Sequence, residues 1–190
     1  MSRVLIINGV PGSGKTTLAH KLAADLQIGC ITKDQFKELL GDSLGIPDRY
    51  EVTAAYGKGA SEALVRVINA LSAIDMTYIA ESAFWAEIAN ERFAEIADPL
   101  SFYLQIYVSC NKDTRKQRFS DRISNGERHE VHWDGLYTDI TEEEIARRYR
   151  PLEFPGLNTI FYDATDPSDN DYVALRQTIQ EWSDDNETTN

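Results

Sequence analysis

The 190-residue sequence contains only two cysteines, Cys30 and Cys110, and no long apolar run. Each cysteine closes a short apolar stretch, which favours buried, reduced thiols over a disulfide framework or a metal site. No segment approaches the roughly 18 uninterrupted apolar residues that a membrane-spanning helix requires. Arg3 is followed by only four apolar residues before Asn8, which is not the layout of a signal peptide. We therefore expect a cytoplasmic protein without membrane association.

Positive charge is also scarce, because 19 Lys and Arg stand against 31 Asp and Glu, giving a formal net charge of −12. Residues 163–190 hold eight of the acids and a single base, so much of the acidity is C-terminal. A chain this acidic repels polyphosphate at long range, which argues against nucleic acid as a partner but leaves room for a local basic groove. The length suits one domain, residues 1–190, with one core.

Apolar periodicity predicts strands that alternate with helices, the pattern of an α/β fold with a five-stranded parallel sheet. Residues 111–156 contain no strand-like apolar run and are rich in arginine and acid, so we predict a helical lid inserted in the domain. Within it, Thr141 opens a helix that must stop before Pro151. The predicted second helix ends at Gly41. The strands are predicted at 3–8, 28–32, 76–80, 102–108 and 158–162, and the other main helices at 15–26, 34–40, 52–73, 87–97 and 171–182.

A glycine loop between the first predicted strand and helix carries the most specific signal in the chain. Gly9-Val-Pro-Gly-Ser-Gly-Lys15-Thr16 matches G-x-x-x-x-G-K-[S/T] at every fixed position, in the strand–loop–helix context that this pattern requires. The glycines allow backbone N–H groups to turn toward phosphates, Lys15 reaches the β and γ phosphates, and the Thr16 hydroxyl can bind Mg²⁺. The residues predicted to bind ATP here are Gly9, Pro11, Gly12, Ser13, Gly14, Lys15, Thr16 and Thr17.

Two acids follow predicted strands at the edge of the sheet where open α/β folds bind ligands. Asp34, just after the second strand, could accept the proton of an acceptor hydroxyl and orient it in line. It could also cap the helix that begins there, and the two roles can coexist. Glu81 ends the third strand, where an acid that holds Mg²⁺ through water is usual, although the usual residue is aspartate. Glu81 could therefore act on the substrate or be structural instead.

Arginines gather in the predicted lid. Arg118 and Arg122 are four apart and share a helix face, and Arg128 follows shortly after. Residues 112–128 hold six bases and three acids, a local positive balance that can neutralise a transferring phosphoryl group. A solvated charged helix is the plainer alternative. His129 and His132 make a poor zinc site without a nearby cysteine, and His129 could touch phosphate.

The glycine loop, Asp34 and these arginines together make the chain resemble the P-loop kinases that include polynucleotide kinase, zeta-toxin and chloramphenicol phosphotransferase relatives. The resemblance implies the three-layer P-loop NTPase sandwich, a lid over ATP and Mg²⁺, and Asp34 as base. By likeness to adenylate-kinase lids, it implies Arg118 on the adenine side and Arg122 on phosphate. We expect Lys15, Asp34, Arg122 and Arg128 to be catalytic and Thr16 and Glu81 to serve the metal.

The phosphoryl acceptor is the part that the sequence identifies least. We expect a small hydroxyl-bearing molecule, held between Asp34 and Glu81 by the aromatic side chains of Phe36, Tyr56, Phe84 and Trp85. The alternative is that these aromatics are core residues, which is the reading we accept if Phe36 is taken alone. A nucleic-acid end kinase and a nucleotide switch or ATPase are the alternatives. A GTPase switch is disfavoured because no guanine-reading N/T-K-x-D motif is present. The oligomeric state is left open.

Overall fold

The computed structural model describes the whole chain except residues 99, 127, 133–140 and 186–190. Its centre is a five-stranded, all-parallel sheet with the strand order β2-β3-β1-β4-β5. This confirms the predicted fold class. All seven residues of the central strand are buried, as expected for a strand covered by helices on both faces. The strands are β1 (Arg3–Gly9), β2 (Gly29–Thr32), β3 (Thr77–Glu81), β4 (Phe102–Ser109) and β5 (Leu157–Asp163).

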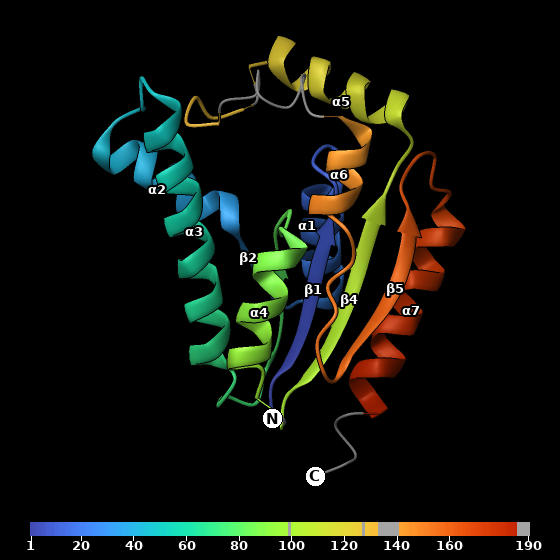
Figure 1. Cartoon of the computed structure of the whole chain (residues 1–190). Coiled ribbons are helices and arrows are strands. Elements are labelled where there is room, and N and C mark those ends of the chain that lie inside the picture. The colour runs from blue at the N-terminus through green and yellow to red at the C-terminus, as the bar shows by residue number, and fades with distance from the viewer. Residues whose placement is uncertain (99, 127, 133–140, 186–190) are drawn as a thin grey trace.

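Helices cover both faces of the sheet, so the domain has three layers (Figure 1). Leu5 and Ile7 of β1 pack in one core cluster with α1 (Lys15–Leu26) and α7 (Asp169–Asp185). Val4 and Ile6 point the other way, into a second cluster beneath α3 (Tyr50–Leu71) and α4 (Ala86–Ile96). Strand alternation therefore divides one short apolar run between two cores. No helix in the described part of the chain is long and apolar enough to cross a membrane.

The remaining helices surround the end of the sheet where the strands terminate. Helix α2 (Lys33–Leu44) packs against α3, and α5 (Lys112–Ser124) and α6 (Glu142–Arg148) lie above the end of β1 (Figure 1). Thr141 caps α6 by accepting the amide of Glu144, as predicted. The last part of the predicted lid, however, belongs to the core, because Leu152 and Phe154 pack in the second cluster.

Helix α2 differs from its predicted form at both ends. Its N-cap is Thr32, whose hydroxyl accepts the amide of Gln35 at 3.2 Å, while the Gln35 side chain accepts the amide of Thr32 at 3.0 Å. This capping box makes Asp34 a first-turn residue and not the cap. The helix also continues through Gly41 to Leu44, so the predicted stop at Gly41 is wrong.

A buried polar pair fixes the end of β1 just before the glycine loop. Asn8 donates to the Gln105 side chain of β4 at 3.1 Å and accepts the amide of Phe84 at 3.2 Å. Gln105 in turn donates to Thr159 at 2.8 Å and accepts the amide of Leu152 at 2.9 Å. Because unpaired polar groups are costly in a core, this saturated network holds β1, β4 and β5 in one arrangement.

Candidate nucleotide and phosphoryl-transfer site

The glycine loop joins β1 to α1 in backbone conformations that only glycine adopts readily. Gly12 and Gly14 have φ values of 82° and 96°, and Gly14 is the N-cap of α1. At Gly9 a Cβ would lie 2.0 Å from the Val108 carbonyl oxygen. The loop therefore bends at the N-terminal end of α1, where free N–H groups and the positive end of the helix dipole favour an anion.

Lys15 and Ser13 place polar atoms inside this loop. Lys15 is buried and its Nζ donates to the Val10 carbonyl oxygen at 2.9 Å. Burial lowers the pKa of Lys15 to about 8, although Glu81 and Asp34 oppose the shift. The Ser13 Oγ is buried and has no hydrogen-bond partner among the described residues. A buried amine and an unsatisfied hydroxyl fit a polyphosphate, which would supply the missing charge and acceptors.

Glu81 stands beside the glycine loop. The strand register sets it opposite Ile7 of β1 and opposite Thr32 of β2. Its Oε2 accepts the Thr16 hydroxyl at 3.3 Å. Burial raises the pKa of Glu81, against the opposing influence of the Lys15 charge.

The pairing of Thr16 with Glu81 fits Mg²⁺, which uses one or two protein oxygens and takes the rest from phosphates and water. The described residues contain no group of three or more His, Cys, Asp or Glu that could hold a metal by themselves. A cation that arrives with the nucleotide needs no such cage. The predicted metal roles of Thr16 and Glu81 stay predictions.

Asp34 lies on the first turn of α2, two residues beyond the end of β2. Its carboxylate is 43 % exposed and lies 3.4 Å from the Lys33 ammonium. Burial of the carboxyl opposes ionisation, but Lys33, His132 and Arg128 together outweigh it and hold the pKa of Asp34 at about 2. The Asp34 charge also acts on Lys15 and Glu81. The candidate base is thus ionised, and its charge acts on the phosphate-binding lysine.

The three lid arginines divide into two groups. Arg118 donates to the carbonyl oxygens of Ser13 at 2.9 Å and Ala164 at 2.7 Å, and so ties the glycine loop to the segment after β5. Arg122 and Arg128 instead converge on the Phe119 ring, with guanidinium carbons 6.0 Å and 5.9 Å from its centroid. Arg118 thus contacts backbone carbonyl groups, whereas Arg122 and Arg128 share an aromatic ring. The predicted roles of Arg118 toward adenine and of the other two toward phosphate are not tested by these contacts.

Phe119 and Arg115 are site residues that sequence reasoning missed. A Cβ added at Gly12 would lie 2.8 Å from the Arg115 Cγ and 2.8 Å from the Phe119 Cε2, so α5 rests directly on the loop. Arg115 is buried and pairs with Glu142 of α6. The signal was present in the spacing, since residues 115, 119 and 122 share one helix face.

The predicted aromatic frame for an acceptor is only partly present. Phe84 is buried and packs edge-on against Phe93 at 5.6 Å, and Phe36 packs against the same core. Assigning Phe84 to a binding site was therefore wrong, because its ring fills the interior. Trp85 is 44 % exposed and its ring lies 4.7 Å from the Arg148 guanidinium. The Tyr56 hydroxyl donates a hydrogen bond to the Gly45 carbonyl oxygen at 3.5 Å.

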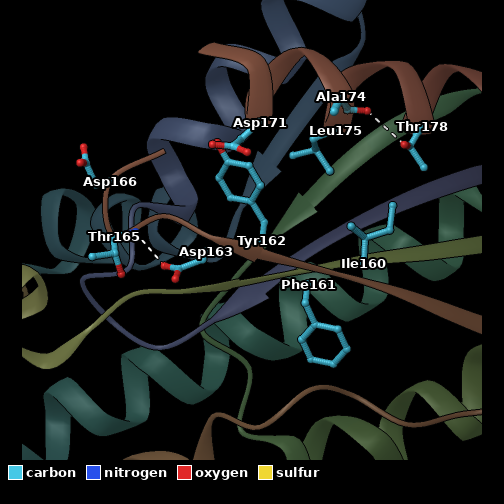
Figure 2. A pocket seen from close by; sticks show the side chains of 10 residues that line it. All are labelled: Ile160, Phe161, Tyr162, Asp163, Thr165, Asp166, Asp171, Ala174, Leu175 and Thr178. Atoms are coloured by element: carbon cyan, nitrogen blue, oxygen red, sulfur yellow. Dashed lines mark hydrogen bonds between the residues drawn. The ribbon is translucent and has the colours of Figure 1, made fainter. Parts of the chain in front are cut away.

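A cavity of about 570 Å³ lies apart from these residues, between β5 and α7 (Figure 2). Figure 2 shows Tyr162 directed toward Asp171 of α7, while Phe161 points to the other side of the strand. The lining of the cavity includes Asp163, Asp166 and Asp171 and no residue of the glycine loop. Three carboxylates repel phosphate, so the cavity is unsuited to the polyphosphate of a nucleotide.

Comparisons with known proteins agree with this geometry. A family profile described as an AAA domain matches residues 4–149. A search of curated proteins finds no match. The crystal structure of a candidate kinase from Chloroflexus aurantiacus J-10-fl has a TM-score of 0.78 and 29 % identity, covering 95 % of this chain and 97 % of that one.

Two more distant structures share the fold. A sugar kinase from Janibacter sp. HTCC2649 has a TM-score of 0.61 at 21 % identity and covers 97 % of this chain and 95 % of its own. Kti12 of Chaetomium thermophilum, in complex with ADP-AlF3, has a TM-score of 0.55 at 16 % identity and covers 94 % and 97 %. The profile match spans well over half of the chain and contains the glycine loop, Asp34 and Glu81. The chain therefore belongs to the AAA domain family of P-loop NTPases, with the kinase-like form of that fold.

Proposed function

We propose that the protein is an ATP-dependent kinase that moves the γ-phosphoryl group of ATP to a hydroxyl of a small molecule. The observation that carries the proposal is the position of Asp34 on the first turn of α2, at the sheet edge where Glu81 accepts the Thr16 hydroxyl of the glycine loop. The Asp34 charge also acts on Lys15 and Glu81. A P-loop switch or ATPase has to place water there, whereas a kinase needs a group that orients an acceptor. The similarity to a candidate kinase and, in fold, to a sugar kinase supports the same reading.

The reaction assigns a role to each charged residue around the loop. Bond formation between the acceptor oxygen and the γ-phosphorus accompanies breakage of the bond to the bridging oxygen of ADP. Lys15 and the loop amides hold the phosphates, and Arg122 and Arg128 offset the charge that spreads over the transferring group. Mg²⁺, held by Thr16 and Glu81, would neutralise the β and γ oxygens.

Asp34 receives the acceptor's proton. Its pKa of about 2 makes it a weak base in the absence of nucleotide. The transition state of phosphoryl transfer is loose, so the acceptor proton is released late and orientation is the main requirement. Bound phosphates would also add negative charge nearby and raise the pKa of the Asp34 carboxyl.

A small acceptor fits the charge distribution better than a nucleic-acid end does. Tracking a polynucleotide needs many Lys and Arg along a groove. In this chain of net charge −12, the bases near the site already serve the phosphates or bridge backbone segments. The α2 face around Asp34 also carries Glu38 and Asp42, which disfavours a phosphate backbone.

The direct test is an assay with γ-labelled ATP, Mg²⁺ and a panel of small hydroxyl compounds, read by label on the acceptor and by ADP release. We expect transfer to a subset of the panel. Lys15→Ala should abolish ATP binding in calorimetry, whereas Asp34→Asn should bind ATP normally and transfer about 10²-fold more slowly. DNA and RNA oligonucleotides belong in the panel. End-labelling of oligonucleotides alone would replace the proposal by a nucleic-acid kinase.

A further inference from the structure

Residues 128–132 lie against helix α2, and we call this segment the strap. Resting on the kinase function proposed above, we infer that the strap docks on α2 at Gly41 and thereby holds Arg128 and His132 around Asp34. Gly41, Val131 and His132 are then positioning residues for phosphoryl transfer. None of the three has to touch a substrate atom.

Gly41 is the residue of α2 against which the strap packs, and we call this position the seat of the strap. It is buried within α2, three residues before the helix ends at Leu44, and glycine is among the least favourable residues inside a helix. A Cβ at this position would lie 3.0 Å from the His129 Cε1, 3.0 Å from the Val131 Cβ and 3.1 Å from the Val131 Cγ2. Val131 is fully buried. The missing side chain lets the strap approach the helix, which gives this helix-interior glycine a physical reason.

Two histidine–carboxylate contacts flank this seat, one turn apart on α2. The Nε2 of His129 lies 3.1 Å from Asp42 Oδ1, and the Nε2 of His132 lies 3.0 Å from Glu38 Oε1. The Val131 amide donates to His129 Nδ1 at 3.1 Å, so the His129 proton is on Nε2 and is donated to Asp42.

The contact between His132 and Glu38 is less exposed to solvent than the contact between His129 and Asp42. The His132 side chain is 5 % exposed, and that of its partner Glu38 is 39 % exposed. Burial lowers the pKa of His132 to about 3, so its ring is neutral near pH 7 and donates its single proton to Glu38. A buried donor with a defined partner fixes the position of the strap more strictly than apolar contact alone does.

The other end of the strap reaches the phosphate side of the site. Arg128 lies over the Phe119 ring, and Phe119 is one of the two side chains next to Gly12 of the glycine loop. The Arg128 charge also acts on both Asp34 and Glu38 of α2. The strap therefore bridges the helix that carries the candidate base and the helix that covers the loop, so docking sets the distance between Arg128 and Asp34.

Gly41→Ala tests this inference without weakening the helix. Alanine is the best helix former, so α2 should be no less stable, yet the new Cβ would push Val131 and His129 away. Gly57→Ala on α3 is the matched control, because a Cβ there meets nothing within 4 Å. We expect trypsin to cleave after Arg128 about tenfold faster in Gly41→Ala, and not in Gly57→Ala.

The kinetic expectation is a loss in kcat and not in nucleotide affinity. Displacing Arg128 should lower kcat by about 10- to 100-fold in Gly41→Ala while the KM for ATP stays near the wild-type value, because small misplacements of a charged group are costly. A second pair of variants keeps the helix intact. His132→Gln retains a donor for Glu38 and should remain close to wild type, whereas His132→Leu should behave like Gly41→Ala.

The outcomes separate the strap from the kinase reading. Cleavage after Arg128 that is equally slow in Gly41→Ala and wild type would overturn the docking. Faster cleavage with an unchanged kcat would overturn the positioning role. A wild-type protein that transfers phosphate to no acceptor refutes the proposed function and with it the positioning role, while the cleavage rates still decide whether the strap is docked.

Discussion

Lys15 links the charge of the glycine loop to a measurable pH dependence of ATP binding. Burial lowers the pKa of Lys15 from 10.5 to about 8, against opposing effects of Glu81 and Asp34. Bound phosphates would place negative charge beside the amine and favour its protonated form. We therefore expect that raising the pH through about 8 weakens ATP binding, and that binding above this pH draws a proton onto Lys15.

The magnitude follows from the pKa. With a value of about 8, the amine is about nine-tenths protonated near pH 7 and about one-tenth protonated near pH 9. If only the protonated form binds, affinity should fall about tenfold over this interval, or about 1.4 kcal/mol. The second ionisation of a phosphate group has its midpoint near pH 6, and burial raises the pKa of Cys30 to about 11, so both midpoints lie outside the window.

Calorimetry in two buffers of different ionisation enthalpy measures the proton directly. Near pH 8.5 we expect an uptake of about three quarters of a proton per ATP. Lys15→Met is the control, because it keeps the chain length without the amine, and like Lys15→Ala it should show neither ATP binding nor proton uptake. No uptake in the wild-type protein together with flat affinity up to about pH 9 would refute the buried, phosphate-binding role of Lys15.

The same shift sets how Lys15 affects stability without nucleotide. Its folded pKa lies below its unfolded value, so between about 8 and 10.5 the unfolded chain holds more protons than the folded one. The Lys15 contribution to the free energy of unfolding therefore increases as the pH rises through this range.

Three further predictions concern the surroundings of the loop. Gly12→Ala should destabilise the fold by about 1–3 kcal/mol, because its φ is 82° and α5 leaves no room. Gly29→Ala, with nothing within 4 Å of its Cβ, should stay within about 0.5 kcal/mol in the same denaturant titration. Thr16→Val should raise the Mg²⁺ concentration for half-maximal transfer about tenfold, and an unchanged requirement would remove Thr16 from the metal site. Lid closure should protect the α5 amides from hydrogen exchange when a non-hydrolysable ATP analogue binds, and equal exchange in both states would argue against a closing lid.

Local patterns were sufficient for much of this protein. The glycine loop could be placed from the sequence because its residues act through neighbouring backbone geometry, within one strand, one turn and one helix. The strands were found within a residue or so because a parallel sheet buried on both faces needs continuous apolar runs. Asp34 and Glu81 could be placed at one edge because the carboxyl ends of parallel strands meet there.

Errors arose where a residue's meaning depends on a partner far along the chain. Gly41 was predicted to end a helix, since glycine usually does, and only the seat for Val131, ninety residues later, shows why it lies inside one. Phe84 was predicted to contact an acceptor, but its ring is buried in the core. In both cases the local sequence does not show whether the residue is buried, because burial depends on which elements pack together.

Tertiary structure alone decided how the lid meets the site. Sequence spacing put Arg118 and Arg122 on a common helix face, but the course of α5 over the glycine loop sends the first to Ser13 and Ala164 and the second to Phe119. The strap likewise has no local signature, since its two histidines find their carboxylates on a helix that precedes them by about ninety residues. The sequence by itself determined the phosphate loop and the sheet, because short-range backbone geometry and apolar periodicity encode them. Which charges surround Asp34 was decided by packing between distant segments, because such contacts depend on the whole fold.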